Sequence, residues 1–428
     1  MTLRVESEIG RLHRVLVHRP GRAIDWMVPS MMERLLFDDI LDTRGAQREH
    51  DRFCAVLEKA GVETIDPETL IAEALEDRSV VDWALSELVR DYGLPESQAR
   101  SFEKLEPGEL AAALIRGVRA DRSQPEDRTP SFFQLAPLPN YFFQRDPQVV
   151  LGDRVLISAM ATEAREREPF LSRLAFEHHP ALAGSSEIFE IDTPASSAPE
   201  HIQGYPYPNL EGGDVLVASS ELVLIGISAR TNLLGAETVA EYLRSRRTSF
   251  RRILLVQLPL KRSYMHLDTV FTFIDHKVCL GYLPVVDPGT AESARVYEID
   301  LEAEELSLTP RRSLRRALAD LGHEVEVIPC GGAEDLLVQQ REQWTDGANA
   351  FAVAPGVILL YRRNRRTLRE LARHGWRVLE DREALGDGVE LLGQGPTVIA
   401  LRASELSRAR GGPRCMTMPL ERDPVGSS

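Results

Sequence analysis

One arrangement of residues recurs along this chain and limits how the chain can fold. A polar residue opens an apolar run, a tight turn follows, and a second apolar run returns. β-Branched runs joined by turn residues are typical of β-hairpins. In the four clearest copies the opening residues are Asp146, Asp214, Asp268 and Asn349. The pattern therefore predicts four hairpins, each with a polar side chain at its start.

Helical segments and lone strands follow several of these hairpins. Ranges 236–246 and 368–374 have apolar residues at helical spacing, and each precedes a short β-branched run. A further helix is expected to begin at Thr309-Pro310, because threonine is a good cap and proline suits a first helical turn. Together these features predict roughly five ββαβ-like units.

Units of this kind cannot bury their apolar faces alone, so they must pack against one another. The last apolar run, 416–420, has no hairpin partner after it. We expect it to pair with the strand around Val15 and to close the units into a ring. A closed ring would bring the polar residues that open the hairpins to one central place.

One segment interrupts the pattern. Residues 70–125 show helical spacing of apolar residues without a strand signal, which predicts a helical insertion. We therefore expect one α/β domain, residues 1–428, with this insertion inside it. Polar stretches at 122–130 and 194–208 predict loops.

Charge and hydropathy restrict the location and the partners. The chain has 428 residues and a formal net charge of −15, which makes nucleic acid and anionic membranes poor partners. No apolar run reaches the roughly 18–20 residues of a membrane helix. The first residues lack the apolar stretch of a secretory signal, so a cytoplasmic location is expected. The oligomeric state is left open, a homo-oligomer included.

One cysteine has neighbours that set it apart from the others. The four cysteines are Cys54, Cys279, Cys330 and Cys415, and none forms a CxxC pair that would indicate a zinc knuckle. Cys415 ends the run Arg-Gly-Gly-Pro-Arg-Cys. Glycines let a backbone approach a ligand, and neighbouring arginines are expected to favour the reactive thiolate. A buried loop cysteine is the alternative interpretation.

The segment His266-Leu267-Asp268 carries a candidate acid–base group. On an extended chain, residues 266 and 268 would share a face. His266 could protonate a leaving group and later activate water. A metal-binding pair or an ordinary surface strand is the alternative.

Several carboxylates could bind a planar cation. Carboxylates bind guanidinium in fork geometry, with two parallel hydrogen bonds. Glu211 and Asp214 flank two glycines, and Asp146 and Asp268 each open a hairpin. An acidic turn at 211–214 and a surface ion pair at Asp146 are the alternatives for these motifs taken alone.

Taken together, the clusters indicate attack on a guanidinium carbon. Two carboxylates would orient the cation, and the thiolate of Cys415 would displace an amine that His266 protonates. Water would then cleave the covalent adduct, with the same histidine as the base.

These motifs resemble those of arginine deiminases, within the guanidino-group-modifying superfamily. The resemblance covers nearly the whole chain and is carried by Val5–Gly10, Asn140–Asp146, Glu211–Asp214, Met265–Thr272 and Arg410–Met416. It implies a five-bladed α/β propeller with an inserted helical bundle. It also implies conversion of L-arginine and water to L-citrulline and ammonia, without a metal or a cofactor.

The resemblance implies a role for each matching residue. Cys415 would be the nucleophile, His266 the acid–base, and Glu211 the residue that positions His266. Asp146 and Asp268 would bind the guanidinium. Substrate contacts are further implied for Asn140, Arg165 and Arg230 on the α-carboxylate, for Arg410 closing over the site, and for Asp214. Gln144, Ala409 and Arg414 differ from the residues that are more common at these positions in the family. These differences bear on the flexibility of the loop and on the pKa of the nucleophile.

Three other functions remain open at this point. An amidinotransferase or agmatine deiminase would share Cys415 and His266 without needing Arg165 and Arg230 for a carboxylate. A metallohydrolase would use His266, Asp268, Asp146 and Glu211 as ligands and leave the cysteine idle. An arginine-binding sensor would need neither the cysteine nor the histidine.

Overall fold

The structure is a computed structural model, and it describes residues 1–120, 132–191 and 207–425. The predicted loop at 122–130, most of the loop at 194–208 and the end of the predicted insertion lie outside the described residues.

The four predicted hairpins all form. In each, the two strands pair antiparallel, with Val149 opposite Leu156 in one and Leu216 opposite Leu224 in another. The strands are β5 (Gln148–Leu151) and β6 (Arg154–Ile157), β8 (Val215–Ser219) and β9 (Leu222–Ile227), β11 (Phe271–Asp275) and β12 (Val278–Gly281), and β16 (Phe351–Ala354) and β17 (Val357–Tyr361).

A helical crossover joins each hairpin to a third strand, which pairs in parallel with the second strand of the hairpin. The third strands are β7 (Ile188–Glu190), β10 (Arg252–Gln257), β15 (Glu326–Pro329) and β19 (Thr397–Leu401). The crossover helices are α7 (Glu168–His178), α8 (Leu233–Ser245), α10 (Leu314–Asp320) and α12 (Arg365–Arg373).

The two ends of the chain form a fifth sheet. β1 (Leu12–Leu16) pairs antiparallel with β20 (Met418–Arg422), with Leu16 opposite Met418, so the predicted pairing of the last apolar run is confirmed. β1 also pairs in parallel with β2 (Glu63–Ile65) across α2 (Thr43–Lys59).

Three details of this arrangement differ from expectation. The helix expected to begin at Thr309-Pro310 forms as α10, but its start is wrong: Thr309–Arg311 is β14, on the edge of a sheet where proline is tolerated, and Ser313 caps α10. β14 and β13 (Arg295–Asp300), which the pattern missed, extend the sheet of β8, β9 and β10. The strand expected after α12 is β18 (Arg377–Glu380), but β19 lies between it and β17.

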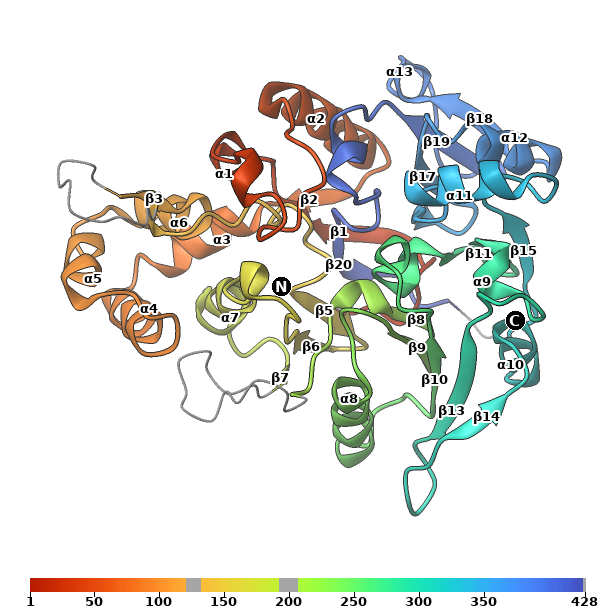
Figure 1. The fold of residues 1–428 in the computed structure, drawn as a ribbon, viewed down its shortest axis with the longest axis horizontal. Helices are drawn as coiled ribbons and strands as arrows, with labels where there is room; N and C mark the ends of the chain where they lie inside the picture. The colour runs from red at the N-terminus through yellow and green to blue at the C-terminus, as the bar shows by residue number, and fades with distance from the viewer. Residues whose placement is uncertain (121–131, 192–206, 426–428) are drawn as a thin grey trace.

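The segment between β2 and β3 (Val118–Arg119) is helical. It contains α3 (Pro67–Ala74), α4 (Arg78–Asp91), α5 (Glu96–Phe102) and α6 (Pro107–Arg116), and β3 pairs with β4 (Phe133–Leu135). These helices lie together at one side of the molecule (Figure 1). Their buried side chains, Leu110 and Leu114 among them, share a core with Phe170 and Leu174 of α7. That the chain forms a single domain, residues 1–428, with this insertion inside it stays a prediction.

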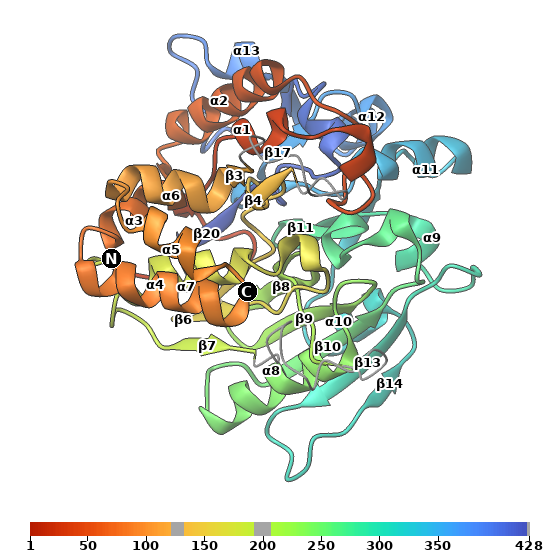
Figure 2. The same ribbon diagram turned by 60° about the vertical axis from the view of Figure 1, so that its left-hand side comes forward.

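The crossover helices α8 and α12 lie toward the outside of the molecule (Figures 1 and 2), whereas α7 packs between β6 and the helices α3 and α4. Short connecting helices are α1 (Arg22–Asp25), η1 (Pro29–Met31), η2 (Glu163–Arg165), η3 (Gly212–Asp214), η4 (Arg262–Tyr264), η5 (Leu267–Thr269), α9 (Leu283–Val286), α11 (Leu336–Trp344), α13 (Asp381–Ala384) and η6 (Leu406–Ala409). None of the helices in the described ranges has both the length and the apolar character needed to cross a bilayer.

Candidate active site

A cavity of about 610 Å³ gathers most of the predicted site residues. Eight of them line it: Asn140, Asp146, Arg165, Glu211, Arg230, His266, Arg410 and Cys415. The two others, Asp214 and Asp268, are fully buried and do not line it. Residues from distant parts of the chain therefore meet at one place.

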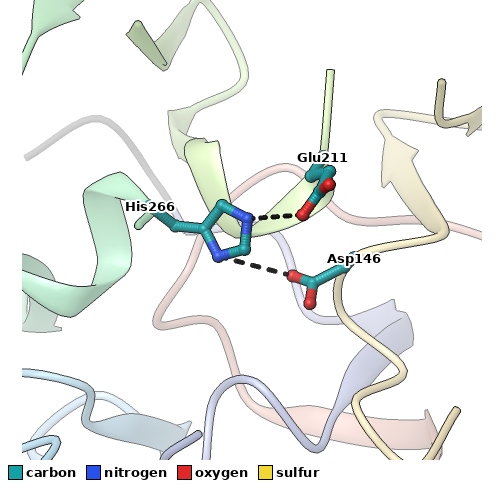
Figure 3. A group of neighbouring side chains, drawn as sticks. All are labelled: Asp146, Glu211 and His266. Carbon is teal, nitrogen blue, oxygen red and sulfur yellow. Dashed lines mark hydrogen bonds and ion pairs between the residues drawn. The ribbon is translucent and has the colours of Figure 1, made fainter. Parts of the chain in front are cut away.

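His266 lies between two carboxylates (Figure 3). Its Nε2 is 2.8 Å from Oε2 of Glu211, and its Nδ1 is 3.8 Å from Oδ1 of Asp146. Burial alone would lower the pKa of His266, but the charge of Asp146 and the hydrogen bond with Glu211 raise that pKa to about 9. The imidazole is therefore a cation at neutral pH and can donate a proton.

The approach of His266 depends on a glycine. A Cβ at Gly213 would lie 2.6 Å from Nδ1 of His266 and 2.9 Å from Oδ1 of Asp146, both closer than van der Waals contact. Any side chain at position 213 would push the histidine away from its carboxylates. The Glu-Gly-Gly-Asp motif thus has a steric reason for its second glycine.

His266 and Asp268 do not share a face of an extended strand, so that expectation is wrong. Residues 267–269 form the turn η5, so residues 266 and 268 are not alternate positions of one strand. Asp214 stabilises this turn, because its Oδ1 accepts the N–H of Leu267 at 2.8 Å. Its Oδ2 accepts the hydroxyl of Ser228, and burial raises the pKa of Asp214 to about 7.

Cys415 lies directly beside Asp268. Its Sγ is 3.9 Å from Oδ2 of Asp268, and Oδ1 of Asn349 accepts the N–H of Cys415 at 3.3 Å and that of Arg414 at 3.0 Å. A Cβ at Gly412 would lie 2.4 Å from that Asn349 oxygen, so the second glycine of the loop permits this contact. Asn349, which opens the fourth hairpin, therefore fixes the backbone of the nucleophile loop.

The expectation of a thiolate is wrong, because burial and the nearby carboxylates outweigh the favourable charge of Arg410. Arg414 binds Asp268 and Glu8 through its guanidinium, while Arg410 lies over the ring of Trp344, with its Cζ 3.3 Å from the centroid. Burial raises the pKa of Cys415 well above its ordinary value, and the nearby carboxylates add to the shift. Without a bound cation the sulfur is a neutral thiol.

Arg165 is fully engaged inside the protein. Its Nε and Nη2 donate to Glu168, and its Nη1 donates to Oδ2 of Asp146. Glu168 was not predicted as a site residue. Only its spacing, three residues after Arg165, could have indicated that the two side chains form an ion pair. Among the residues described, Oδ1 of Asp146 and Oδ1 of Asp268 are buried and accept no hydrogen bond.

Arg230 and Asn140 line the cavity with spare polar atoms. Nη1 of Arg230 is 3.3 Å from the hydroxyl of Thr162 and 3.7 Å from Oε1 of Glu211. Asn140 donates from Nδ2 to the carbonyl of Leu35 at 2.8 Å. Both side chains could therefore accept a further polar ligand.

The same carboxylates could in principle hold a metal ion. Asp146, Glu211 and His266 each offer a ligand atom, and these atoms lie within 4.8 Å of one another. Asp268, also proposed as a ligand, is outside this group. Nη1 of Arg165 lies 4.0 Å from Oε2 of Glu211, so a divalent cation would have to share the site with an arginine.

Solved structures share this fold. An amidinotransferase, SxtG from Microseira wollei, matches with a TM-score of 0.55 and 13% identity over 99% of this chain and 98% of its own. A dimethylarginine dimethylaminohydrolase from Pseudomonas aeruginosa, complexed with citrulline, matches with a TM-score of 0.50 and 14% identity over 96% and 99%. The chain thus has the α/β fold of these two enzymes.

Sequence comparison is more specific. The family described as arginine deiminase matches residues 33–422. An arginine deiminase of Listeria innocua serovar 6a is 38% identical over 98% of both chains, and one of Bacillus cytotoxicus is 34% identical over 99% of both. The chain belongs to the arginine deiminase family of enzymes.

Proposed function

We propose that the chain hydrolyses L-arginine to L-citrulline and ammonia through a covalent adduct on Cys415. Family membership supports the overall reaction. One observation carries the mechanism: Asp146 and Asp268 each have a buried carboxylate oxygen, Oδ1, without a hydrogen bond, and the two side chains lie beside the imidazole of His266 and the sulfur of Cys415 respectively. Buried acceptors of this kind favour a cationic donor, and guanidinium has the matching geometry.

Binding of the substrate would activate the nucleophile. The carboxylates around Cys415 raise the pKa of the thiol, and a bound guanidinium would offset their charge. The thiol would then lose its proton to solvent as the cation enters. Cationic His266 is ready at the same moment to serve as the acid.

The proposed chemistry takes two stages. The thiolate attacks the guanidinium carbon, His266 gives its proton to one terminal amine, and ammonia leaves, so that a cationic thiouronium remains on Cys415. Neutral His266 then takes a proton from water, and the hydroxide adds to the same carbon. The C–S bond breaks to return the thiolate, and citrulline forms after loss of one proton.

The α-carboxylate is assigned to Arg230 and Asn140. Arg165 is less suited, because each of its nitrogens already donates to Glu168, Asp146 or the carbonyl of Phe143. We infer that Arg165 instead orients Asp146, and that Arg230 supplies the charge that recognises the carboxylate. Arg410, at the mouth of the cavity, would cover the bound substrate.

A metallohydrolase is the second candidate, favoured by the group of Asp146, Glu211 and His266. Arg165 and Arg230 lie within 4.0 Å of Glu211 and would repel a divalent ion. Assay of citrulline formation from L-arginine with excess chelator separates the two. Full activity supports the proposal, while loss of activity that zinc or magnesium restores would favour the metal enzyme. Absence of citrulline under both conditions would favour a binding protein.

We also propose that the five sheets form a closed propeller. The sheets contact one another in order around the molecule. β20 contacts β5, Asp146 lies beside Gly213, η3 contacts η5, β11 contacts β16, and β16 contacts β1. This order returns to its starting sheet and would hold the hairpin starts together at the site.

A further inference from the structure

A second cavity, of about 520 Å³, lies apart from the substrate cavity and has a different lining. It lies between α2, the start of α12 and residues 402–405, which precede η6. Three carboxylates line it together with six arginines: Arg48, Arg52, Arg362, Arg363, Arg365 and Arg402. A protein with a net charge of −15 therefore has a locally positive cleft.

The carboxylates of this cleft are committed to the backbone. Both oxygens of Glu49 accept N–H groups, from Ser404 at 2.7 Å and from Glu405 and Leu406 at 2.9 and 3.0 Å. Asp42 caps α2 through the N–H of Gly45. These acids stabilise the loop and the helix, so they do not fully offset the arginines.

The arginines divide into two groups. Arg52 and Arg402 lie 3.4 and 3.7 Å from buried Asp381 and neutralise it, and Arg362 lies 3.1 Å from Glu380. In contrast, no carboxylate in the described part of the chain lies within 4.0 Å of Arg363 or Arg365, and Arg48 is 3.8 Å from Asp42. The second group thus carries charge that no buried carboxylate neutralises.

We propose that this cleft binds a small polyvalent anion of the phosphate class. Arginines from three segments of the chain line one cavity, and the fork geometry of guanidinium matches phosphate oxygens. The volume is that of a small-molecule site. The net negative charge of the whole protein disfavours a long polyanion such as nucleic acid.

The cleft is connected to the substrate cavity through one short segment. Arg363 donates a hydrogen bond to the hydroxyl of Ser407, in η6. Two and three residues later, Ala409 and Arg410 line the substrate cavity. An anion that draws Arg363 toward itself would move this segment, so we expect bound anion to change KM for L-arginine. This second expectation rests on the proposed function.

Calorimetry tests the site without any need for activity. The full chain is titrated at constant ionic strength with pyrophosphate, with inorganic phosphate and with glucose 6-phosphate. We expect saturable binding of one anion per chain. If glucose 6-phosphate binds more tightly than inorganic phosphate, the ligand of the cleft is a phosphate ester. If inorganic phosphate binds more tightly, the ligand is a free inorganic anion.

Variants locate the binding. Arg48→Ala with Arg365→Ala removes two exposed arginines that neutralise no buried carboxylate, so the fold should persist. Loss of two charge-assisted contacts should weaken pyrophosphate binding at least about tenfold. Arg369→Ala is the control. Arg369 lies on α12, as Arg365 does, but it lines a different cavity, which has equal numbers of arginines and carboxylates.

The outcomes separate the two parts of the proposal. No saturable binding, or equal binding by the double variant and the wild-type chain, would overturn the site. A change in sedimentation of the double variant without a change in anion binding would identify the cleft as an interface between copies and would also overturn it. Binding that leaves KM unchanged would remove the connection to the substrate cavity and leave the site in place.

Discussion

Nη1 of Arg414 lies 2.8 Å from Oδ2 of Asp268, and the side chains are only 1% and 0% exposed. Through its other nitrogens the same guanidinium binds Glu8, near the N-terminus. Arg414, the residue before the nucleophile Cys415, therefore neutralises Asp268, the carboxylate beside the sulfur of Cys415. Burial would lower the pKa of Arg414, but Glu8 and Asp268 raise it above its ordinary value, so the arginine stays charged.

Arg414→Met should destabilise the protein strongly, because it leaves two buried carboxylates without a partner. We expect a loss of about 3–5 kcal/mol in the free energy of unfolding, measured by denaturant titration. Arg408→Met is the control: its ion pairs with Asp39 and Glu405 are partly exposed and contribute at most about 1 kcal/mol. Equal losses in the two variants would contradict this account of the buried pair.

Glu211→Gln should move the alkaline limb of the pH profile of kcat/KM, which reports the free enzyme, toward lower pH. His266 must be protonated to release ammonia, so activity should fall as the pH rises through its pKa of about 9. The hydrogen bond with Glu211 helps raise that pKa, and loss of the carboxylate charge lowers it. An alkaline limb that stays in place or moves upward would argue against His266 as the acid.

Gly213→Ala should lower kcat because the new methyl group displaces His266. A shift of about 1 Å at a catalytic group can cost roughly 10²-fold in rate. Gly108→Ala in α6 provides the control, since a Cβ there meets no atom within 4 Å. If both variants retain the wild-type kcat, the histidine does not need its present position.

Arg230→Ala should reduce the preference for L-arginine over agmatine, which lacks the α-carboxylate. A site built for a polar group rejects an analogue without it by roughly 10⁴-fold or more. The native enzyme should therefore be a poor agmatine deiminase, and the variant should lose mainly its activity on arginine. The measurement is kcat/KM for both substrates in both proteins. Similar values for the two substrates in the native enzyme would contradict recognition of the α-carboxylate by this site.

Local patterns predicted the hairpins, because turn residues and β-branched runs act within a few residues of each other. β19 was missed, since it is a short apolar run that becomes a central strand only through pairing with β17 and β18. The pairing of β1 with β20 could be predicted because the last run had no other partner.

Which residues form the site could be predicted better than how those residues are arranged. Cys415, His266, Glu211 and Asp146 meet as expected, because each stands in a distinctive motif. The turn at 267–269 was not predicted, since it depends on a hydrogen bond from Leu267 to Asp214, 53 residues away. The pair of Arg414 and Glu8 spans 406 residues, and no local spacing could indicate it.

The central claim is a covalent adduct on Cys415 that keeps the whole carbon skeleton of L-arginine. Two arginine samples, one radiolabelled in the carbon chain and one in the guanidino carbon, are quenched with acid during turnover, and the peptide that contains Cys415 is isolated. We predict both labels on that peptide, and neither in Cys415→Ser. The guanidino label alone would indicate an amidinotransferase. Absence of both labels from the wild-type peptide during citrulline formation would contradict catalysis through Cys415.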